Sequence, residues 1–237
     1  MTTTDLSAPS GPAGRARPAG FDLAETDRLL TTTRAVRRRL DLTRPVDPQV
    51  VLDCLRIAIQ APSGTNSQRW RWLVVDDPDL RAGLAELYRE SFVPYRDRGR
   101  AMLEERGEDP DNPIMRSSEH LADHLHEVPV HVIPCWLDRL PEQPTTADMA
   151  GLFGSIVPAV WNFTLALHSR GLGTTFTTLH LPREREAAAL LGIPDTVTQV
   201  ALLPVAHIVG TGFKPAARRP VEEITYRNGW RRPVQAP

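Results

Sequence analysis

The chain has few of the features that would place it in a specialised class of protein. Only two of its 237 residues are cysteines, Cys54 and Cys135, and they form no Cys-x-x-Cys pair. We interpret both as buried thiols in a reducing cytoplasm. Lys and Arg number 28 against 29 Asp and Glu, so the net charge is −1. This balance gives no reason to expect nucleic acid or an anionic membrane as a partner.

Long apolar runs are also scarce. The longest, GLFGSIVPAVWNFTLAL at 151–167, is interrupted by Gly, Pro and Asn and is too short to span a membrane. The first residues, MTTTDLSAPSGPAGRARPAG, are small and rich in Pro and Gly, without the apolar centre that a secretory signal needs. We therefore expect residues 1–25 to form a disordered tail and residues 26–237 to form one folded domain.

The hydrophobic pattern predicts an α+β protein. Apolar residues recur at helical spacing, or fill the segment, at 22–40, 48–60, 151–171 and 182–192. Residues 78–127 look helical with intervening loops. Runs rich in β-branched and aromatic residues predict strands at 70–77, 128–138, 173–179 and 198–210. These elements do not alternate strictly as βαβ units, which favours a layered sheet over a doubly wound one.

The segment 151–170 predicts an unusual helix, because it is apolar on almost every side. A helix of this kind is buried, so we expect it to lie in the core or at a subunit interface. Three tryptophans, Trp72, Trp136 and Trp161, are interpreted as core residues.

Four polar segments remain after the core is assigned: TRAVRRR at 33–39, APSGTNSQRW at 61–70, GLGTTFTTLH at 171–180 and GFKPAARRPVEEI at 212–224. Each has an ordinary explanation, respectively a solvated helix end, a turn, a β-branched strand and surface charge. Each also suits a ligand, because guanidinium groups bind phosphate and small residues expose backbone N–H groups. No single segment decides between these interpretations.

Together, in this order and spacing, the four segments resemble the motifs of the FMN-dependent nitroreductase family. The resemblance covers roughly residues 28–230. It implies a mixed, largely antiparallel sheet flanked by helices, in an intertwined homodimer with two FMN sites at the interface. The polar loop would come from one subunit and the strand beside flavin N5 from the other.

The resemblance also implies which residues bind FMN. The phosphate motif corresponds to Arg34, Ala35, Val36 and Arg37, and the C-terminal motif adds Lys214 and Arg218. The loop over the ribityl chain and ring corresponds to Pro62, Ser63, Gly64, Asn66 and Gln68. The N5 segment corresponds to Thr177, Thr178 and Leu179, with a backbone N–H at Thr178 or its neighbour as the catalytic contact.

The sequence departs from the family at several of these positions. Ala35 replaces the usual Ser of the phosphate motif, and Arg69 replaces the usual Pro before Trp70. Thr178 stands where some members have Glu, and Leu179 where many have Gly. A backbone N–H can still reach N5, so we expect FMN binding to survive and substrate preference to differ.

The function implied by the resemblance is reduction of a small-molecule electron acceptor, a nitroaromatic, a quinone or a similar electrophile. NADPH or NADH would supply hydride through flavin N5 in a ping-pong cycle, and no nucleophilic side chain is needed. The alternatives within this fold are reductive dehalogenation and a biosynthetic dehydrogenation. Dehalogenases of iodotyrosine need an acidic and aromatic lid, for which ELYRESFVPYRDRGR at 86–100 is an unconvincing candidate. A nucleic-acid binder built on RAVRRRLDLTR is a distant alternative, disfavoured by the net charge.

Histidines are concentrated at 120–131. His120 and His124 lie one helical turn apart, which is a spacing that metal ligands use. A polar helix face explains the same spacing more simply, so no metal site is predicted.

Overall fold

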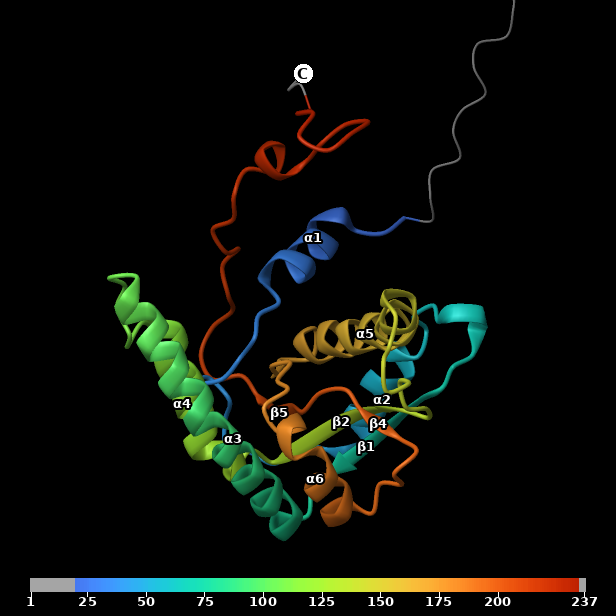
Figure 1. Cartoon of the computed structure of the whole chain (residues 1–237), viewed down its shortest axis with the longest axis vertical. Coiled ribbons are helices and arrows are strands. Elements are labelled where there is room, and N and C mark those ends of the chain that lie inside the picture. Colours follow the sequence, from blue (N-terminus) through green and yellow to red (C-terminus); the bar gives the residue numbers. More distant parts are fainter. Residues whose placement is uncertain (1–19, 235–237) are drawn as a thin grey trace, which may run out of the picture.

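The computed structural model describes residues 20–234 and contains a central sheet with helices on both faces (Figure 1). The strands are β1 (Trp70–Val75), β2 (Val130–Trp136), β3 (Leu172–Gly173), β4 (Thr198–Gln199) and β5 (Leu203–His207). Their order is β1-β2-β5-β3, with β4 also paired to β2, and all these ladders are antiparallel. One isolated parallel bridge joins Ala35 to Thr174. The predicted α+β architecture with a mixed, largely antiparallel sheet is confirmed.

Two helical layers cover the sheet. The helices are α1 (Leu23–Thr32), α2 (Pro48–Ala58), α3 (Pro78–Glu105), α4 (Pro113–His124), α5 (Thr146–His168) and α6 (Glu184–Leu191). Short 3₁₀ turns occupy Gly64–Asn66, Leu125–Glu127, Leu181–Arg183 and Val221–Ile224. Helices α2 and α5 pack together on one face, and α3 packs against α4 and α6 on the other (Figure 1).

The central strand β2 is buried along its whole length and supplies both halves of the core. Val130, Val132 and Trp136 belong to the apolar cluster under α2 and α5. Ile133 and Cys135 point to the cluster under α3, α4 and α6. This alternation follows from the two-residue period of a strand, and it fixes the register against β1 because a shift of one residue would exchange the faces.

Local signals in the sequence set where the helices begin. Asp47, Asp77 and Asn112 accept hydrogen bonds from the first-turn N–H groups of α2, α3 and α4, and a proline follows each of them. Such caps satisfy N–H groups that have no partner within the helix. Helix α5 begins with a reciprocal capping box between Thr145 and Asp148.

The helix predicted over 22–40 is wrong in its second half. Helix α1 ends at Thr32; the chain then bridges to Thr174 at Ala35, turns at residues 37–39, where the Leu40 N–H donates to the Arg37 carbonyl, and bridges to Ile208 at Leu40. The hydroxyls of Thr31, Thr32 and Thr33 each bond a carbonyl four residues earlier, a competition with the backbone that weakens a helix end. The boundary predicted for the tail, residue 25, also falls inside α1, while residues 1–19 of that tail lie outside the described range.

Two predicted strands are broken. The segment 173–179 continues β3 for one residue only and then makes isolated bridges at Thr174 and Thr177. The segment 198–210 divides into β4 and β5. The first break matters for the site, because backbone that leaves a ladder has free N–H groups.

Helix α5 is the one helix of residues 20–234 that is long and apolar enough to cross a membrane. In the fold it lies on the sheet, with Ile156, Ala159 and Phe163 fully buried in the core. Beside this buried face, a stripe of apolar side chains spaced four residues apart is 38–47% exposed: Met149, Phe153, Val157 and Trp161. We call this the α5 stripe. The interpretation of Trp161 as a core residue is therefore wrong within a single chain.

Residues 209–234 form a C-terminal arm that leaves the body on the same side as α1 (Figure 1). The arm exposes large apolar side chains, of which Trp230 is 82% exposed and Val221 and Ile224 are each 61% exposed. Its root is held by Arg39, whose guanidinium donates to the carbonyls of Val209 and Thr211 and stacks on Phe213 at 4.2 Å. The arm thus starts from a fixed point but carries its own apolar surface uncovered.

Candidate functional site

A cavity of about 310 Å³ opens between α5, the extended segment after α1 and the arm. We call it the arginine cavity. It is lined by Thr33, Arg34, Ala35, Arg37, Val157, Val160, Trp161, Thr164, Thr174, Thr175, Phe176 and Arg218. Four segments distant in sequence therefore meet here, and three of them are the polar motifs at 33–39, 171–180 and 212–224.

The charged side chains that line the arginine cavity are all cationic. It contains three guanidinium groups, from Arg34, Arg37 and Arg218, and no carboxylate. Arg34 donates to the Lys214 carbonyl, and Arg218 donates to the Ala217 carbonyl at 3.0 Å. Within residues 20–234 none of the three arginines forms an ion pair. Converging, uncompensated arginines are an arrangement that suits a phosphate group.

Two threonines that line the arginine cavity have buried side-chain hydroxyls without partners within residues 20–234. Thr174 and Thr175 are 2% and 1% exposed, and the side-chain oxygen of each lacks a hydrogen-bond partner among the described residues. A buried polar atom without a partner costs on the order of 1–3 kcal/mol. A ligand with several oxygen and nitrogen atoms would remove that cost.

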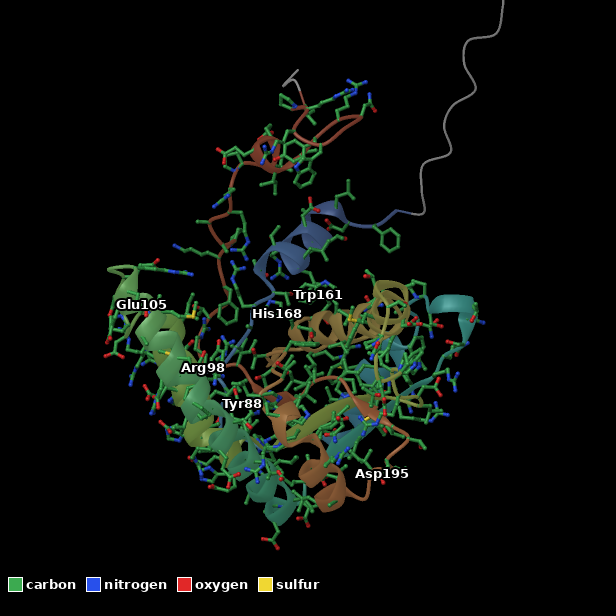
Figure 2. All side chains as sticks on the ribbon, in the orientation of Figure 1. Tyr88, Arg98, Glu105, Trp161, His168 and Asp195 are labelled. Atoms are coloured by element: carbon green, nitrogen blue, oxygen red, sulfur yellow. The ribbon has the colours of Figure 1, made fainter. Side chains whose placement is uncertain are left out.

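A second cavity of about 200 Å³ adjoins the first at Arg37 and Phe176. We call it the tyrosine cavity. Its other lining residues are Tyr88, Tyr95, Ser118, Thr177, Thr178 and Leu179. The helix pair α3 and α4 therefore covers the segment that follows Phe176, and Figure 2 shows Tyr88 on the side of α3 that faces the sheet.

Hydrogen bonding organises the tyrosine cavity. The buried Tyr88 hydroxyl lies 3.2 Å from the Thr177 hydroxyl, and burial raises the pKa of this phenol, so it stays protonated. The Thr177 N–H donates to the Leu202 carbonyl, whereas the next N–H, that of the exposed Thr178, has no acceptor within residues 20–234. A backbone N–H is therefore available at Thr178, and its contact with flavin N5 stays a prediction.

The polar loop at 61–70 has a strained, anchored backbone. Thr65, Asn66 and Gln68 all have left-handed φ angles, at 53°, 54° and 48°. That conformation is rare for a β-branched residue such as Thr65 and costs on the order of 1–3 kcal/mol per residue. Strain that is retained in this way is typical of a ligand-binding loop.

Two contacts hold the loop in place. The Gly64 N–H donates to the buried Ser155 hydroxyl on α5 at 3.0 Å, and the Arg69 side chain pairs with Asp138 at 2.6 Å. Arg69, which replaces the family's Pro, thus ties the loop exit to the end of β2. The loop lies beside the first turns of α5 and lines neither cavity.

The structure thus brings together only part of the predicted cofactor site. Arg34, Ala35, Arg37 and Arg218 line the arginine cavity, and Thr177, Thr178 and Leu179 line the tyrosine cavity. Pro62, Ser63, Gly64, Asn66 and Gln68 remain with the loop, away from both cavities of the same chain. The Lys214 side chain is exposed and lines neither cavity. Val36 is a core residue, 3% exposed, and its N–H donates to the Thr174 carbonyl, which leaves only its own carbonyl oxygen for a ligand.

Several lining residues were not predicted from the sequence. Trp161 and Val157 reach the arginine cavity from a helix interpreted as core, and Phe176 was not singled out within its motif. Tyr88 and Tyr95 lie in the stretch 86–100, the candidate lid of the sequence analysis. The aromatic residues of that stretch were the one sequence signal that could have identified them as lining residues. The pair His120 and His124 has ring centroids 4.5 Å apart, and His124 bonds Glu127 at 2.6 Å. These histidines line neither cavity.

Comparison with known proteins is consistent with this geometry. The Nitroreductase family matches residues 30–207. Iodotyrosine deiodinase from Thermotoga neapolitana is 26% identical over 202 residues, which cover 84% of this chain and 95% of that protein.

Solved structures agree in fold. An oxidised iodotyrosine deiodinase bound to FMN and 3-iodo-L-tyrosine has a TM-score of 0.58 at 24% identity, covering 84% of this chain and 97% of the other. An FMN and NADPH-dependent nitroreductase from Sphigopyxis sp. strain HMH has a TM-score of 0.62 at 20% identity, covering 89% and 100%.

Proposed function

Because the chain belongs to the nitroreductase family, we propose that it is an FMN-dependent oxidoreductase that uses NADPH or NADH to reduce a small electrophile such as a nitroaromatic or a quinone. The observation that carries the proposal is the arginine cavity, which combines three guanidinium groups without ion pairs and two threonines whose buried hydroxyls lack partners, all judged within residues 20–234. This donor set fits the phosphate and ribityl oxygens of FMN.

In this proposal each segment has a definite role. Arg34 and Arg218 bind the phosphate, the hydroxyls of Thr174 and Thr175 bond the ribityl chain, and the free N–H of Thr178 faces N5 of the ring. When bound, FMN would supply reversible hydride chemistry between the nicotinamide and the acceptor. The side chains bind and orient both molecules, and the α3–α4 cover limits the access of water.

The proposal includes a homodimer. The loop at 61–70 is shaped for a ligand yet lies away from the cavities of its own chain, whereas the α5 stripe borders the arginine cavity through Val157 and Trp161. A second copy packed on the α5 stripe would place its loop at this cavity and bury the apolar side chains. Obligate interfaces have this core-like composition. Hydride chemistry with NAD(P)H and the buried free thiols support a cytoplasmic location.

The same proposal is tested directly on purified protein. We expect a yellow preparation that releases FMN on denaturation, with close to one FMN per chain, and bleaching of the flavin by NADPH or NADH under anaerobic conditions. Nitroaromatics and quinones should restore the colour. Protein that stays colourless after FMN addition and dialysis would rule the proposal out.

Reductive dehalogenation is the second candidate, favoured by the deiodinase from Thermotoga neapolitana as the full-length relative described above. The two candidates differ in their products. Release of iodide from 3-iodo-L-tyrosine by dithionite-reduced protein, without turnover of nitroaromatics by NAD(P)H, would favour the dehalogenase. Turnover of nitroaromatics with no iodide release would favour the first candidate.

The phosphate ligands give a sharper prediction. Arg34→Ala and Arg218→Ala are each expected to weaken FMN binding by about 2–3 kcal/mol, a factor of roughly 30–150, because each removes one charge-assisted contact. Equilibrium dialysis or flavin fluorescence measures the change. The control is Arg185→Ala, an exposed arginine on α6 that lines neither cavity. Wild-type affinity in both cavity variants would exclude these side chains as phosphate ligands.

A further inference from the structure

We propose that the tyrosine cavity binds an anionic group on the electron acceptor, and that Arg37 makes the enzyme selective for single-ring aromatic carboxylates and phenolates. The inference rests on the proposed function and adds the substrate class of that same site. It also reassigns Arg37, which sequence resemblance groups with the phosphate ligands.

Arg37 lies between the two cavities and lacks an anionic partner among the described residues. Arg37 lines both cavities and so lies where the two adjoin, whereas Arg218 of the arm lines the arginine cavity alone. Arg37 is half-buried and has neither an ion pair nor a side-chain hydrogen bond within residues 20–234. A partly desolvated cation without a partner is costly, and an anionic ligand removes that cost.

The remaining polar side chains that line the tyrosine cavity all carry neutral hydroxyls. Those of Tyr95 and Thr178 are not engaged within residues 20–234, whereas the Ser118 hydroxyl donates to the Ile114 carbonyl at 3.0 Å and the Tyr88 hydroxyl lies 3.2 Å from that of Thr177. A carboxylate or phenolate oxygen can accept from several hydroxyls and the guanidinium at once. The set of donors therefore matches an anion more closely than a neutral carbonyl.

Among residues 20–234, no carboxylate lines the tyrosine cavity. Two acids on the covering helices are paired elsewhere, since Glu119 pairs with Arg96 at 3.2 Å and with Arg100 at 3.3 Å, and Asp97 pairs with Arg96. An ammonium group in the cavity would consequently face Arg37 without a counter-charge. The cavity favours a simple anion over an amino-acid zwitterion.

Shape and apolar contacts define the rest of the substrate. Phe176 and Leu179 are the apolar residues of the tyrosine cavity, and Phe176 lines both cavities. The volume of about 200 Å³ is below the roughly 300–1,000 Å³ of sites for drug-sized ligands. It accommodates one substituted aromatic ring.

The test compares 4-nitrobenzoate with methyl 4-nitrobenzoate, which differ in charge but share the reducible nitro group. We expect FMN-loaded wild type to prefer the carboxylate at least about tenfold in kcat/KM, and Arg37→Gln to lose that preference mainly through KM. Arg38→Gln is the matched control, because Arg38 is the adjacent exposed arginine and lines neither cavity. It should keep the wild-type ratio.

A binding measurement supports the test without turnover. Benzoate, which is not reducible, should perturb the absorbance of oxidised bound FMN in wild type and in Arg38→Gln, and about tenfold more weakly in Arg37→Gln, while benzamide should show no such difference. In the same titration 3-(4-hydroxy-3-iodophenyl)propionate should bind more tightly than 3-iodo-L-tyrosine, because only the latter carries an ammonium group.

The outcomes separate the inference from the proposed function. Wild type that binds no FMN would overturn both. FMN-loaded enzyme with equal affinity for the acid and the ester, or tighter binding of the amino acid, would overturn the inference alone. If Arg37→Gln loses FMN but keeps the wild-type ratio of kcat/KM for the acid and the ester, Arg37 is a ligand of the FMN phosphate and the inference is overturned.

Discussion

Replacing Phe153 by Glu is expected to give a monomer that no longer retains FMN. Phe153 is 40% exposed in the single chain, belongs to the α5 stripe and lines neither cavity, so its replacement leaves the protomer core and the cavity wall intact. In a two-fold dimer the change occurs on both sides of the interface. Burying an unpaired carboxylate costs several kcal/mol, and two of them should weaken association on the order of a thousandfold or more.

Sedimentation velocity at micromolar concentration, with absorbance in the flavin band, measures assembly and FMN together. The control is Ile114→Glu, because Ile114 at the start of α4 is 74% exposed and lies outside the α5 stripe. It should remain dimeric and yellow and unfold near the wild-type temperature, whereas Phe153→Glu should still unfold cooperatively but at a lower temperature, because it lacks the stabilisation that FMN and the second copy provide. A wild-type monomer that carries FMN, or a Phe153→Glu dimer, would contradict the proposal that the loop of a second copy completes the FMN site.

Acidification from pH 6.5 to pH 4 is expected to destabilise the fold by several kcal/mol through His131 and His180. Both side chains are 0% exposed, and burial lowers the pKa of each from 6.5 to about 4. The His131 Nε2–H donates to the Leu125 carbonyl at 2.9 Å, which suits the neutral ring. Glu184 opposes the effect at His180 but does not offset burial.

The sign follows from proton binding in the two states. Above pH 6.5 both histidines are neutral, folded or unfolded, and contribute no pH dependence. Between pH 6.5 and 4 the unfolded chain binds protons that the folded chain excludes, so stability falls as pH falls, by up to about 1.4 kcal/mol per pH unit for each histidine. Below pH 4 the folded state also becomes protonated and this contribution levels off.

Urea unfolding at pH 7.0, 6.0 and 5.0 measures the slope. The pKa values of His120, His168 and His207 are also lowered, mainly by burial, so the test compares slopes between variants rather than the absolute curve. His131→Gln and His180→Gln should each flatten the slope even if they lower stability at pH 7. Equal slopes in all three proteins would contradict the assignment.

The sequence predicted those elements whose pattern has a single physical explanation. β1 and β2 have aromatic and β-branched residues bounded by turn signals, and α2 begins with an Asp cap followed by Pro48. The helix over 22–40 was over-extended because its apolar spacing continues through Val36 and Leu40. Those two residues are buried by pairing with Thr174 and Ile208, contacts that are remote in sequence and override local propensity.

The site was predictable to the extent that chemistry appears in short motifs. The arginines and threonines of the two cavities stand in recognisable segments, whereas Val157 and Trp161 look like any other apolar residues of α5. A helix that is apolar all round does not reveal which side packs in its own chain and which side is left for another. The position of the loop at 61–70, away from Arg34, likewise depends on tertiary structure that the motif does not encode.

The contacts that Arg39 makes at the root of the arm bear on the rate and the free energy of association in the proposed homodimer. By fixing Val209, Thr211 and Phe213 at the root of the arm, they set the direction in which residues 214–234 leave the body before any second copy arrives. Conformational freedom that is restricted in the free protein need not be lost on association, which lowers the entropic cost of binding. The Arg39 guanidinium therefore pre-organises the root of the arm, and in the proposed homodimer its influence should appear in the association rate rather than in the fold.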